Sequence, residues 1–227
     1  MRIILGIDRL DYTKGIPERL IAFQRLLEAR PDLLGRVTMA QIVVPSREDI
    51  PEYMQLKLRI ETLVSKINGH YSRTGWVPIH YFYRSISRAE LMAFYRAAHV
   101  ALVTPLKDGM NLVAKEFCAS RVDERGVLVL SEFAGAAAEL DCGALLVNPH
   151  DAEGVAAALE LALGMDDAEQ SRRMQKMRSQ IRLHDVFRWC QSFQRRNCDW
   201  PSVSPNGIGT RDDVSQILEP SFSRRAK

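Results

Sequence analysis

The sequence lacks the features that mark secreted, membrane and metal-stabilised proteins. Its 227 residues include four cysteines, which stand far apart with no C-x-x-C spacing. This pattern argues against a zinc site and a disulfide framework, and it fits a reducing cytoplasm. No run approaches the roughly 18 apolar residues of a membrane span, and charges follow the first short apolar run too soon for a signal peptide. We therefore expect a cytoplasmic protein that does not enter a membrane.

The charge balance and the missing motifs exclude further functions. The 31 basic and 28 acidic residues are intermixed and give a net charge of +3, with no basic, aromatic-interleaved stripe for nucleic acid. The five histidines are scattered singly, so we expect structural or exposed roles for them. The absence of G-x-G-x-x-G, P-loop and G-x-S-x-G motifs argues against simple NAD or ATP binding and against an elbow-type serine hydrolase.

Short apolar runs rich in β-branched residues are the main structural signal. Several are apolar almost throughout, which is typical of strands buried on both faces of a sheet. Helical patterns separate them, and one begins with Ser87 and Glu90 at the spacing of a capping box. This alternation predicts an α/β fold, a Rossmann-like parallel sheet flanked by helices. The predicted strands are residues 2–8, 37–44, 77–84, 100–105, 126–132 and 143–149.

The strand signals stop at about Met165. Helical patterns follow over residues 166–182 and 184–196, and after Trp200 the chain is rich in Ser, Pro and Gly. We predict a nucleotide-sugar-binding domain over 1–200 and a disordered tail over 201–227.

The loop after the first predicted strand carries two cations, Arg9 and Lys14. Ligands of open α/β sheets bind outside the carboxyl ends of the strands, which is where this loop begins. Arginine offers a rigid fork for phosphate oxygens, and lysine offers a mobile point charge. The alternative is an ordinary solvated loop in which Asp8 and Asp11 pair with these cations.

A second loop, with the sequence TPLKDGMNLVAKE, opens a predicted helix. Asp108 and Asn111 are suited to cap that helix, and Gly109 tolerates backbone geometry closed to other residues. The free N–H groups of a helix start favour a phosphate, and the carboxylate of Glu116 suits vicinal hydroxyls. The alternative is a capped helix with a Lys115–Glu116 pair at its surface.

Several segments resemble the trehalose-6-phosphate synthases, the retaining GT-B glycosyltransferases of family 20. The resemblance runs in order from Ile3 to about Arg195, and RLDYTKG and DGMNLVAKE are its most specific motifs. It covers only the C-terminal, donor-binding half of the family, and the N-terminal half that holds much of the glucose 6-phosphate site is missing. Because Met1 stands just before the first predicted strand, we expect a fragment that is inactive without the other half.

The resemblance implies transfer of glucose from UDP-glucose to glucose 6-phosphate with retention, giving trehalose 6-phosphate and UDP. Arg9, Lys14 and Asp108 are the implied catalytic residues. Arg9 and Lys14 would hold the donor diphosphate, and Arg47 would contact the acceptor phosphate. Without a placed nucleophile, front-face attack explains retention, and no metal or other cofactor is expected. The implied donor-binding residues are Arg9, Lys14, Ile86, Asp108, Gly109, Met110, Asn111, Leu112, Val113 and Glu116.

Two other interpretations stay open at this point. The chain could be a non-catalytic nucleotide-sugar-binding or regulatory module that partners a synthase chain. It could also be a different retaining glycosyltransferase with another acceptor or another NDP-glucose, since the residues do not separate UDP from ADP or GDP. Arg47 favours a phosphorylated acceptor. The expected partners are the two substrates, and either an N-terminal half or a second copy of the chain.

Overall fold

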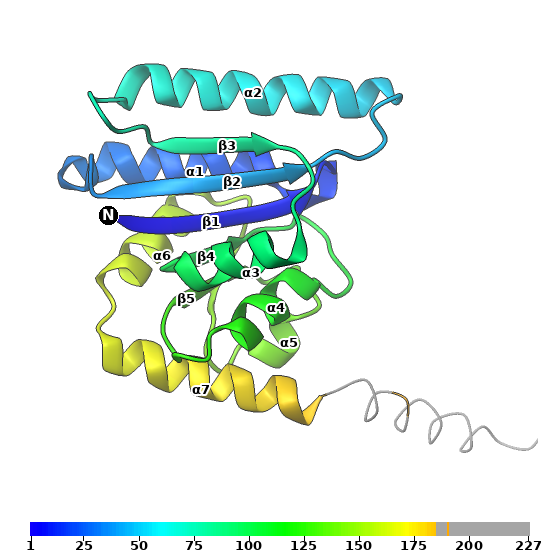
Figure 1. The fold of residues 1–227 in the computed structure, drawn as a ribbon, viewed down its shortest axis with the longest axis vertical. Helices are drawn as coiled ribbons and strands as arrows, with labels where there is room; N and C mark the ends of the chain where they lie inside the picture. Colours follow the sequence, from blue (N-terminus) through cyan, green and yellow to red (C-terminus); the bar gives the residue numbers. More distant parts are fainter. Residues whose placement is uncertain (185–189, 191–227) are drawn as a thin grey trace, which may run out of the picture. The chain divides into compact units, whose positions relative to one another are not determined.

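A six-stranded parallel sheet forms the centre of the fold (Figure 1). Its order is β3-β2-β1-β4-β5-β6, and every neighbouring pair is parallel. The predicted fold class is confirmed, and each predicted apolar run matches one strand to within two residues at either end. The strands are β1 (Arg2–Arg9), β2 (Val37–Val44), β3 (Ile79–Tyr83), β4 (Val100–Val103), β5 (Val127–Ser131) and β6 (Leu145–Val147).

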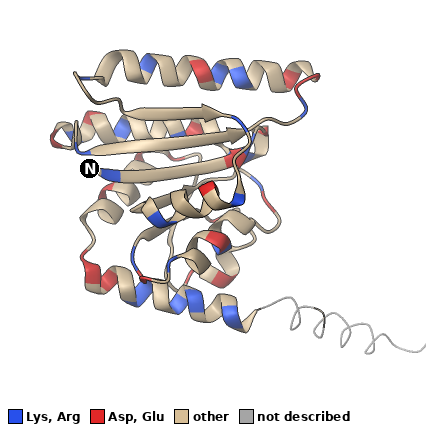
Figure 2. Cartoon of the chain, in the orientation of Figure 1, with Lys and Arg blue, Asp and Glu red and all other residues tan. Residues whose placement is uncertain are grey.

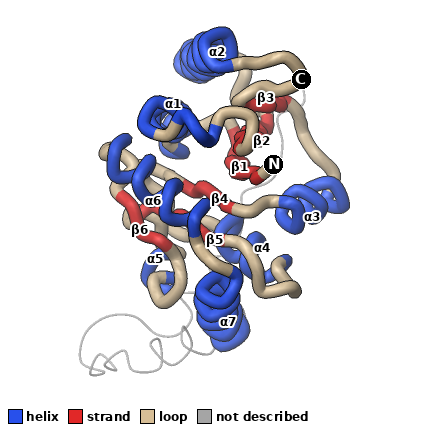
Figure 3. The backbone as a smooth tube through the Cα atoms, turned by 90° about the vertical axis from the view of Figure 1, so that its left-hand side faces the viewer, coloured by secondary structure: helices blue, strands red, loops and turns tan. Residues whose placement is uncertain are grey.

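Helices connect the strands and cover both faces of the sheet (Figure 3). One apolar cluster joins the sheet to α1, α2 and α6, and a second joins the opposite face to α3, α4, α5 and α7. The four central strands β1, β2, β4 and β5 are mostly buried, which is why they read as continuous apolar runs, whereas the edge strands β3 and β6 are only partly buried. The helices are α1 (Ile16–Ala29), α2 (Pro51–Tyr71), α3 (Arg88–Ala97), α4 (Leu112–Ser120), α5 (Ala137–Leu140), α6 (Ala152–Gly164) and α7 (Asp167–Leu183), with short 3-10 turns η1 (Tyr12–Lys14) and η2 (Pro31–Leu33).

The computed structural model describes residues 1–184 and residue 190. Most of the helix predicted over 184–196, the boundary at 200 and the tail over 201–227 therefore lie outside the described residues. Within the described residues, no helix is both long and apolar enough to cross a membrane. Figure 2 shows both basic and acidic residues along the helices.

Two helix boundaries compare directly with the sequence patterns. The Ser87 side chain accepts a hydrogen bond from the Glu90 N–H at 3.2 Å, so the predicted cap of α3 is confirmed. The Asn68-Gly69 pair, which is typical of a helix end, does not end α2, because the helix continues to Tyr71. The Asn68 side chain instead donates to the Ile79 carbonyl and accepts from its N–H, both at 2.9 Å, and so fixes α2 to β3.

The strand order places a topological switch point between β1 and β4. The chain moves outward from β1 to β3 and then returns to lay β4 on the other side of β1. The loops that leave β1 and β4 therefore part in opposite directions at the carboxyl edge, and this is where open α/β sheets bind ligands. The two motif loops are the ones that leave β1 and β4.

Candidate functional site

The loops after β1 and β4 contact each other through their backbones. The N–H of Leu106 donates to the Thr13 carbonyl at 2.7 Å. Gly15 adopts φ 63°, and a Cβ there would lie 2.2 Å from the Thr104 carbonyl oxygen. Only glycine fits a left-handed position this close to another backbone. The glycine of the first motif is thus required by the approach of the second loop.

A lysine from one loop and an aspartate from the other form the centre of the site. Lys14 Nζ lies 2.7 Å from Asp108 Oδ2, and the two side chains are 15% and 16% exposed. Burial raises the pKa of Asp108, but the Lys14 hydrogen bond, with help from the Met110 N–H and the Asn111 amide, brings that pKa below its ordinary value. An ammonium carries three protons, so Lys14 keeps donors for a ligand while it contacts Asp108.

Helix α4 begins beside this pair. Asn111 is its N-cap at φ 73°, and its side-chain oxygen accepts from the Ala114 N–H at 3.0 Å. The amides of Leu112 and Val113 occupy the first two helical positions, where no intrahelical acceptor exists. The Asn111 prediction is confirmed, but the cap assigned to Asp108 and the special geometry assigned to Gly109 are wrong. The residue with positive φ is Asn111, and Asp108 binds Lys14.

The Lys115–Glu116 surface pair considered from the sequence is also wrong. Lys115 Nζ lies 2.8 Å from both carboxylate oxygens of Glu139 on α5. Glu116 is exposed and accepts a hydrogen bond from the buried Tyr95 hydroxyl at 3.0 Å. Burial and the neighbouring Glu116 raise the pKa of Tyr95, so this hydroxyl stays a donor. The Tyr95 hydroxyl therefore orients the Glu116 carboxylate, whose remaining lone pairs can still accept hydrogen bonds from a ligand.

The loop between β5 and α5 fixes the other side of the Asp108 loop. The N–H of Gly135 donates to the Asp108 carbonyl at 2.8 Å, and the N–H of Ala136 donates to the Met110 carbonyl at 2.7 Å. The Asp108 loop thus has backbone hydrogen bonds to the β1 loop on one side and to the β5–α5 loop on the other, which restricts its movement. Three loops from three strands thus build the site.

The cations and carboxylates of the first loop do not pair as the sequence allowed. Asp8 pairs with the buried Arg19 at 2.7 Å, and Asp11 accepts from the Thr13 N–H at 2.9 Å. Arg9 ends β1 with an exposed side chain, and among the described residues it has no side-chain hydrogen bond or ion pair. The alternative in which Asp8 and Asp11 neutralise the loop cations is therefore wrong, and Arg9 remains available to an anion.

Arg47 and Ile86 lie on the loops after β2 and β3, farther along the same carboxyl edge. Arg47 adopts φ 52° and donates to the Tyr53 hydroxyl at 2.7 Å. The Tyr53 ring meets the Tyr12 ring of η1 edge-on, with centroids 6.1 Å apart. Arg47 is thus linked through two tyrosines to the β1 loop, although it does not contact Lys14 or Asp108.

Sequence reasoning missed Arg19, which is 1% exposed beneath the two loops. A signal for it was present, since Arg19 follows Ile16 by three residues and precedes Phe23 by four, on the apolar face of α1. A charge on the buried face of an amphipathic helix needs a polar partner.

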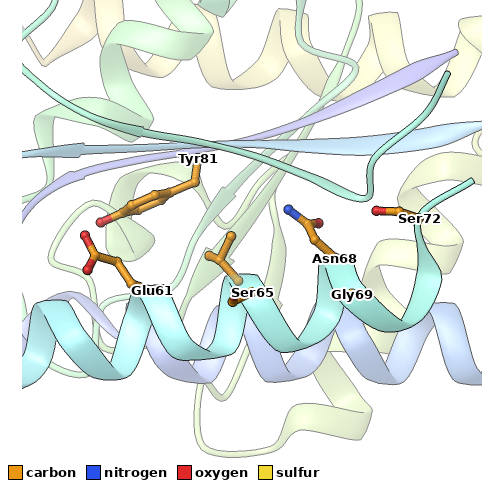
Figure 4. Close-up of a pocket in the computed structure, with 7 residues that line it drawn as sticks. Glu61, Ser65, Asn68, Gly69, Ser72 and Tyr81 are labelled. Atoms are coloured by element: carbon orange, nitrogen blue, oxygen red, sulfur yellow. The ribbon is translucent and has the colours of Figure 1, made fainter. Parts of the chain in front are cut away.

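A hollow of about 540 Å³ lies elsewhere, between α2 and β3 (Figure 4). The Tyr81 hydroxyl is buried there and has no hydrogen-bond partner among the described residues. Burial and the charge of Glu61 raise the pKa of Tyr81. The lining contains no residue of the β1 or β4 loops, so this hollow is separate from the candidate site. It is lined by Glu61, Val64, Ser65, Asn68, Gly69, Ser72 and Tyr81.

The family model of glycosyltransferase family 20 matches residues 1–197 of the chain. The trehalose-6-phosphate synthase of Mycobacterium avium is 52% identical over 192 residues, which are 85% of this chain and 39% of that protein. The chain therefore spans about two fifths of the length of such a relative.

Solved structures of trehalose-phosphate synthases match a similar share of this chain. The UDP-forming alpha,alpha-trehalose-phosphate synthase of Burkholderia xenovorans, in complex with glucose-6-phosphate, is 46% identical with a TM-score of 0.83, and the match covers 86% of this chain and 43% of that one. The E. coli protein bound with UDP-2-fluoro glucose is 44% identical with a TM-score of 0.84, over 86% of this chain and 44% of that one.

Proposed function

Because the chain belongs to glycosyltransferase family 20, we propose that it is the donor-binding part of a UDP-forming trehalose-6-phosphate synthase in the cytoplasm. The observation that carries this proposal is the Lys14–Asp108 pair beside the start of α4 at the switch point. A lysine, unpaired helix amides and an orienting carboxylate together suit a ligand with both a diphosphate and sugar hydroxyls. Nucleotide sugars have this composition.

The roles follow from the chemistry of each group. Arg9 and the free protons of Lys14 would contact the diphosphate, as would the amides of Leu112 and Val113. The remaining lone pairs of Asp108 would accept from glucose hydroxyls, helped by the backbone of Gly109, Met110 and Asn111. The Glu116 carboxylate would accept from the ribose hydroxyls, and the backbone at Ile86 would meet the uracil.

We infer a reaction in which the acceptor hydroxyl attacks the anomeric carbon on the face that UDP leaves. A departing phosphate oxygen takes the acceptor proton, so the configuration is retained without a protein nucleophile. The charge that develops on UDP is the quantity that the site must stabilise, and fixed cations and helix amides do this without reorganisation.

A complete site for the acceptor requires residues beyond those of this chain. Arg47 is the one acceptor contact that we assign to this chain, toward the phosphate of glucose 6-phosphate. Since the chain spans 39% of a relative's length, we propose that an N-terminal half supplies the rest of the acceptor site. The chain alone is expected to bind the donor and to form no trehalose 6-phosphate.

Calorimetric titration of the chain with UDP tests the donor site. Arg9→Ala and Lys14→Ala should each weaken UDP affinity at least tenfold, a loss of about 1.4 kcal/mol. Arg36→Ala and Lys176→Ala are matched controls, because both residues are exposed, Arg36 at the amino end of β2 and Lys176 on α7. They should change the affinity less than about twofold, within the spread typical of surface substitutions. A folded wild-type chain that binds no UDP would falsify the donor assignment, and trehalose 6-phosphate formation by the chain alone would refute the need for a second half.

A further inference from the structure

Arg19 carries a buried charge that none of the roles above uses. It belongs to the first turns of α1, and its side chain is fully buried. The guanidinium reaches polar groups on β1, on β2 and on the loops after β1 and β4. It donates to Asp8 Oδ2 at 2.7 Å, Thr104 Oγ1 at 3.0 Å, Gln41 Oε1 at 3.4 Å and the Lys14 carbonyl at 3.5 Å. We call Asp8, Arg19, Gln41 and Thr104 the Arg19 network.

The sheet leaves space for this guanidinium at one position of β1. A Cβ on Gly6 would lie 2.4 Å from Gln41 Oε1 and 2.7 Å from an Arg19 terminal nitrogen. Any side chain at position 6 would displace the Arg19 guanidinium. The strand therefore forgoes apolar packing at Gly6 in order to admit an ion.

Stability alone does not explain a buried ion at this place. Replacing a buried ion pair with apolar side chains of similar volume is often neutral or stabilising. Unlike an apolar side chain, a guanidinium makes directional interactions, because its planar group of N–H donors fixes the angles at which its hydrogen-bond acceptors lie. Here the partners are strand ends and loops that carry the candidate site.

The network contacts both loops of the candidate site. Arg19 binds the Lys14 carbonyl, and the Lys14 ammonium binds Asp108. Arg19 also binds the hydroxyl of Thr104, whose carbonyl oxygen packs against Gly15. One guanidinium therefore holds both loops from the buried side of the site. Arg19 is not itself exposed to a ligand.

We propose that Arg19 is a positioning residue for the donor site, and that it acts through Thr104 and the Lys14 backbone to hold the β1 and β4 loops in the spacing that a diphosphate requires. This inference rests on the proposed function for its ligand. It predicts that loss of a single bond of the network weakens UDP binding even when the fold is intact.

The experiment compares Thr104→Val with Thr104→Ser. Valine has nearly the shape of threonine but cannot accept from Arg19 Nε, whereas serine keeps the hydroxyl. Because one net hydrogen bond is lost, Thr104→Val should weaken UDP affinity about fivefold at a temperature where both variants are fully folded by circular dichroism. Thr104→Ser should stay within about twofold, since it restores the bond.

A measurement without ligand separates this proposal from the proposed function. The Leu106 amide, which donates to Thr13 across the two loops, should exchange with solvent about tenfold faster in Thr104→Val. The Val129 amide at the centre of β5 should keep its protection. If wild type binds UDP and Thr104→Val changes neither the affinity nor the Leu106 exchange, the positioning role is wrong. If wild type binds no UDP, the proposed function fails, and the Leu106 exchange still decides whether the network holds the loops.

Discussion

Replacement of Gly15 by alanine would force apart the two loops that build the site. The new Cβ would lie 2.2 Å from the Thr104 carbonyl oxygen and 3.1 Å from Leu106 Cδ2, at a φ of 63°. A left-handed conformation costs a non-glycine residue roughly 1–2 kcal/mol. No rotamer change relieves a contact with backbone, so the overpacking should add about 1–3 kcal/mol. The expected loss of about 2–5 kcal/mol is a large share of the roughly 5–15 kcal/mol that holds a domain folded.

The matched control is Gly35→Ala. Gly35 also has positive φ, 81°, but a Cβ there would meet nothing within 4 Å. It should therefore cost only the conformational part, about 1–2 kcal/mol. Urea unfolding followed by circular dichroism gives both values, and UDP titration below the transition gives the effect on binding. Equal destabilisation by the two variants, or full UDP affinity in Gly15→Ala, would show that the close approach of the loops is not what requires glycine.

Two other predictions concern the Asp108–Asn111 segment. Asn111→Ala should destabilise the chain by about 1–2 kcal/mol more than Asn111→Gly in urea unfolding. Both variants lose the side-chain cap, but only alanine also opposes the positive φ. Equal losses would contradict this account of the α4 start. The pKa of Asp108 is lowered on folding, so its contribution to stability is complete above the unfolded pKa of about 3.9 and declines as pH falls through the lower folded pKa. The stability gap between wild type and Asp108→Asn should thus be widest at neutral pH and shrink below about pH 4, and a gap that stays constant or widens in acid would refute the Lys14 pairing.

The sequence by itself determined the strands and the types of side chain that occupy the loops of the candidate site. Strands buried on both faces are apolar throughout, so the central strands β1, β2, β4 and β5 could be predicted from local composition. The cap of α3 could be predicted from Ser87 and Glu90. The residues of the two motifs could be singled out from the sequence, but their types alone also fitted an ordinary capped helix, and the family resemblance was needed to favour ligand binding. A parallel sheet then requires that the loops after its strands meet at one edge.

Only the tertiary structure decided which groups are partners. Lys14 and Asp108 are 94 residues apart in sequence and meet because β4 lies beside β1. Lys115 pairs with Glu139 instead of its sequence neighbour Glu116, because successive residues of a helix point in different directions. Arg19 could be seen as a misplaced charge in α1, but its acceptors come from three separate segments. Local sequence fixes backbone conformation and burial, whereas a hydrogen bond between distant residues depends on strand order, which no single segment encodes.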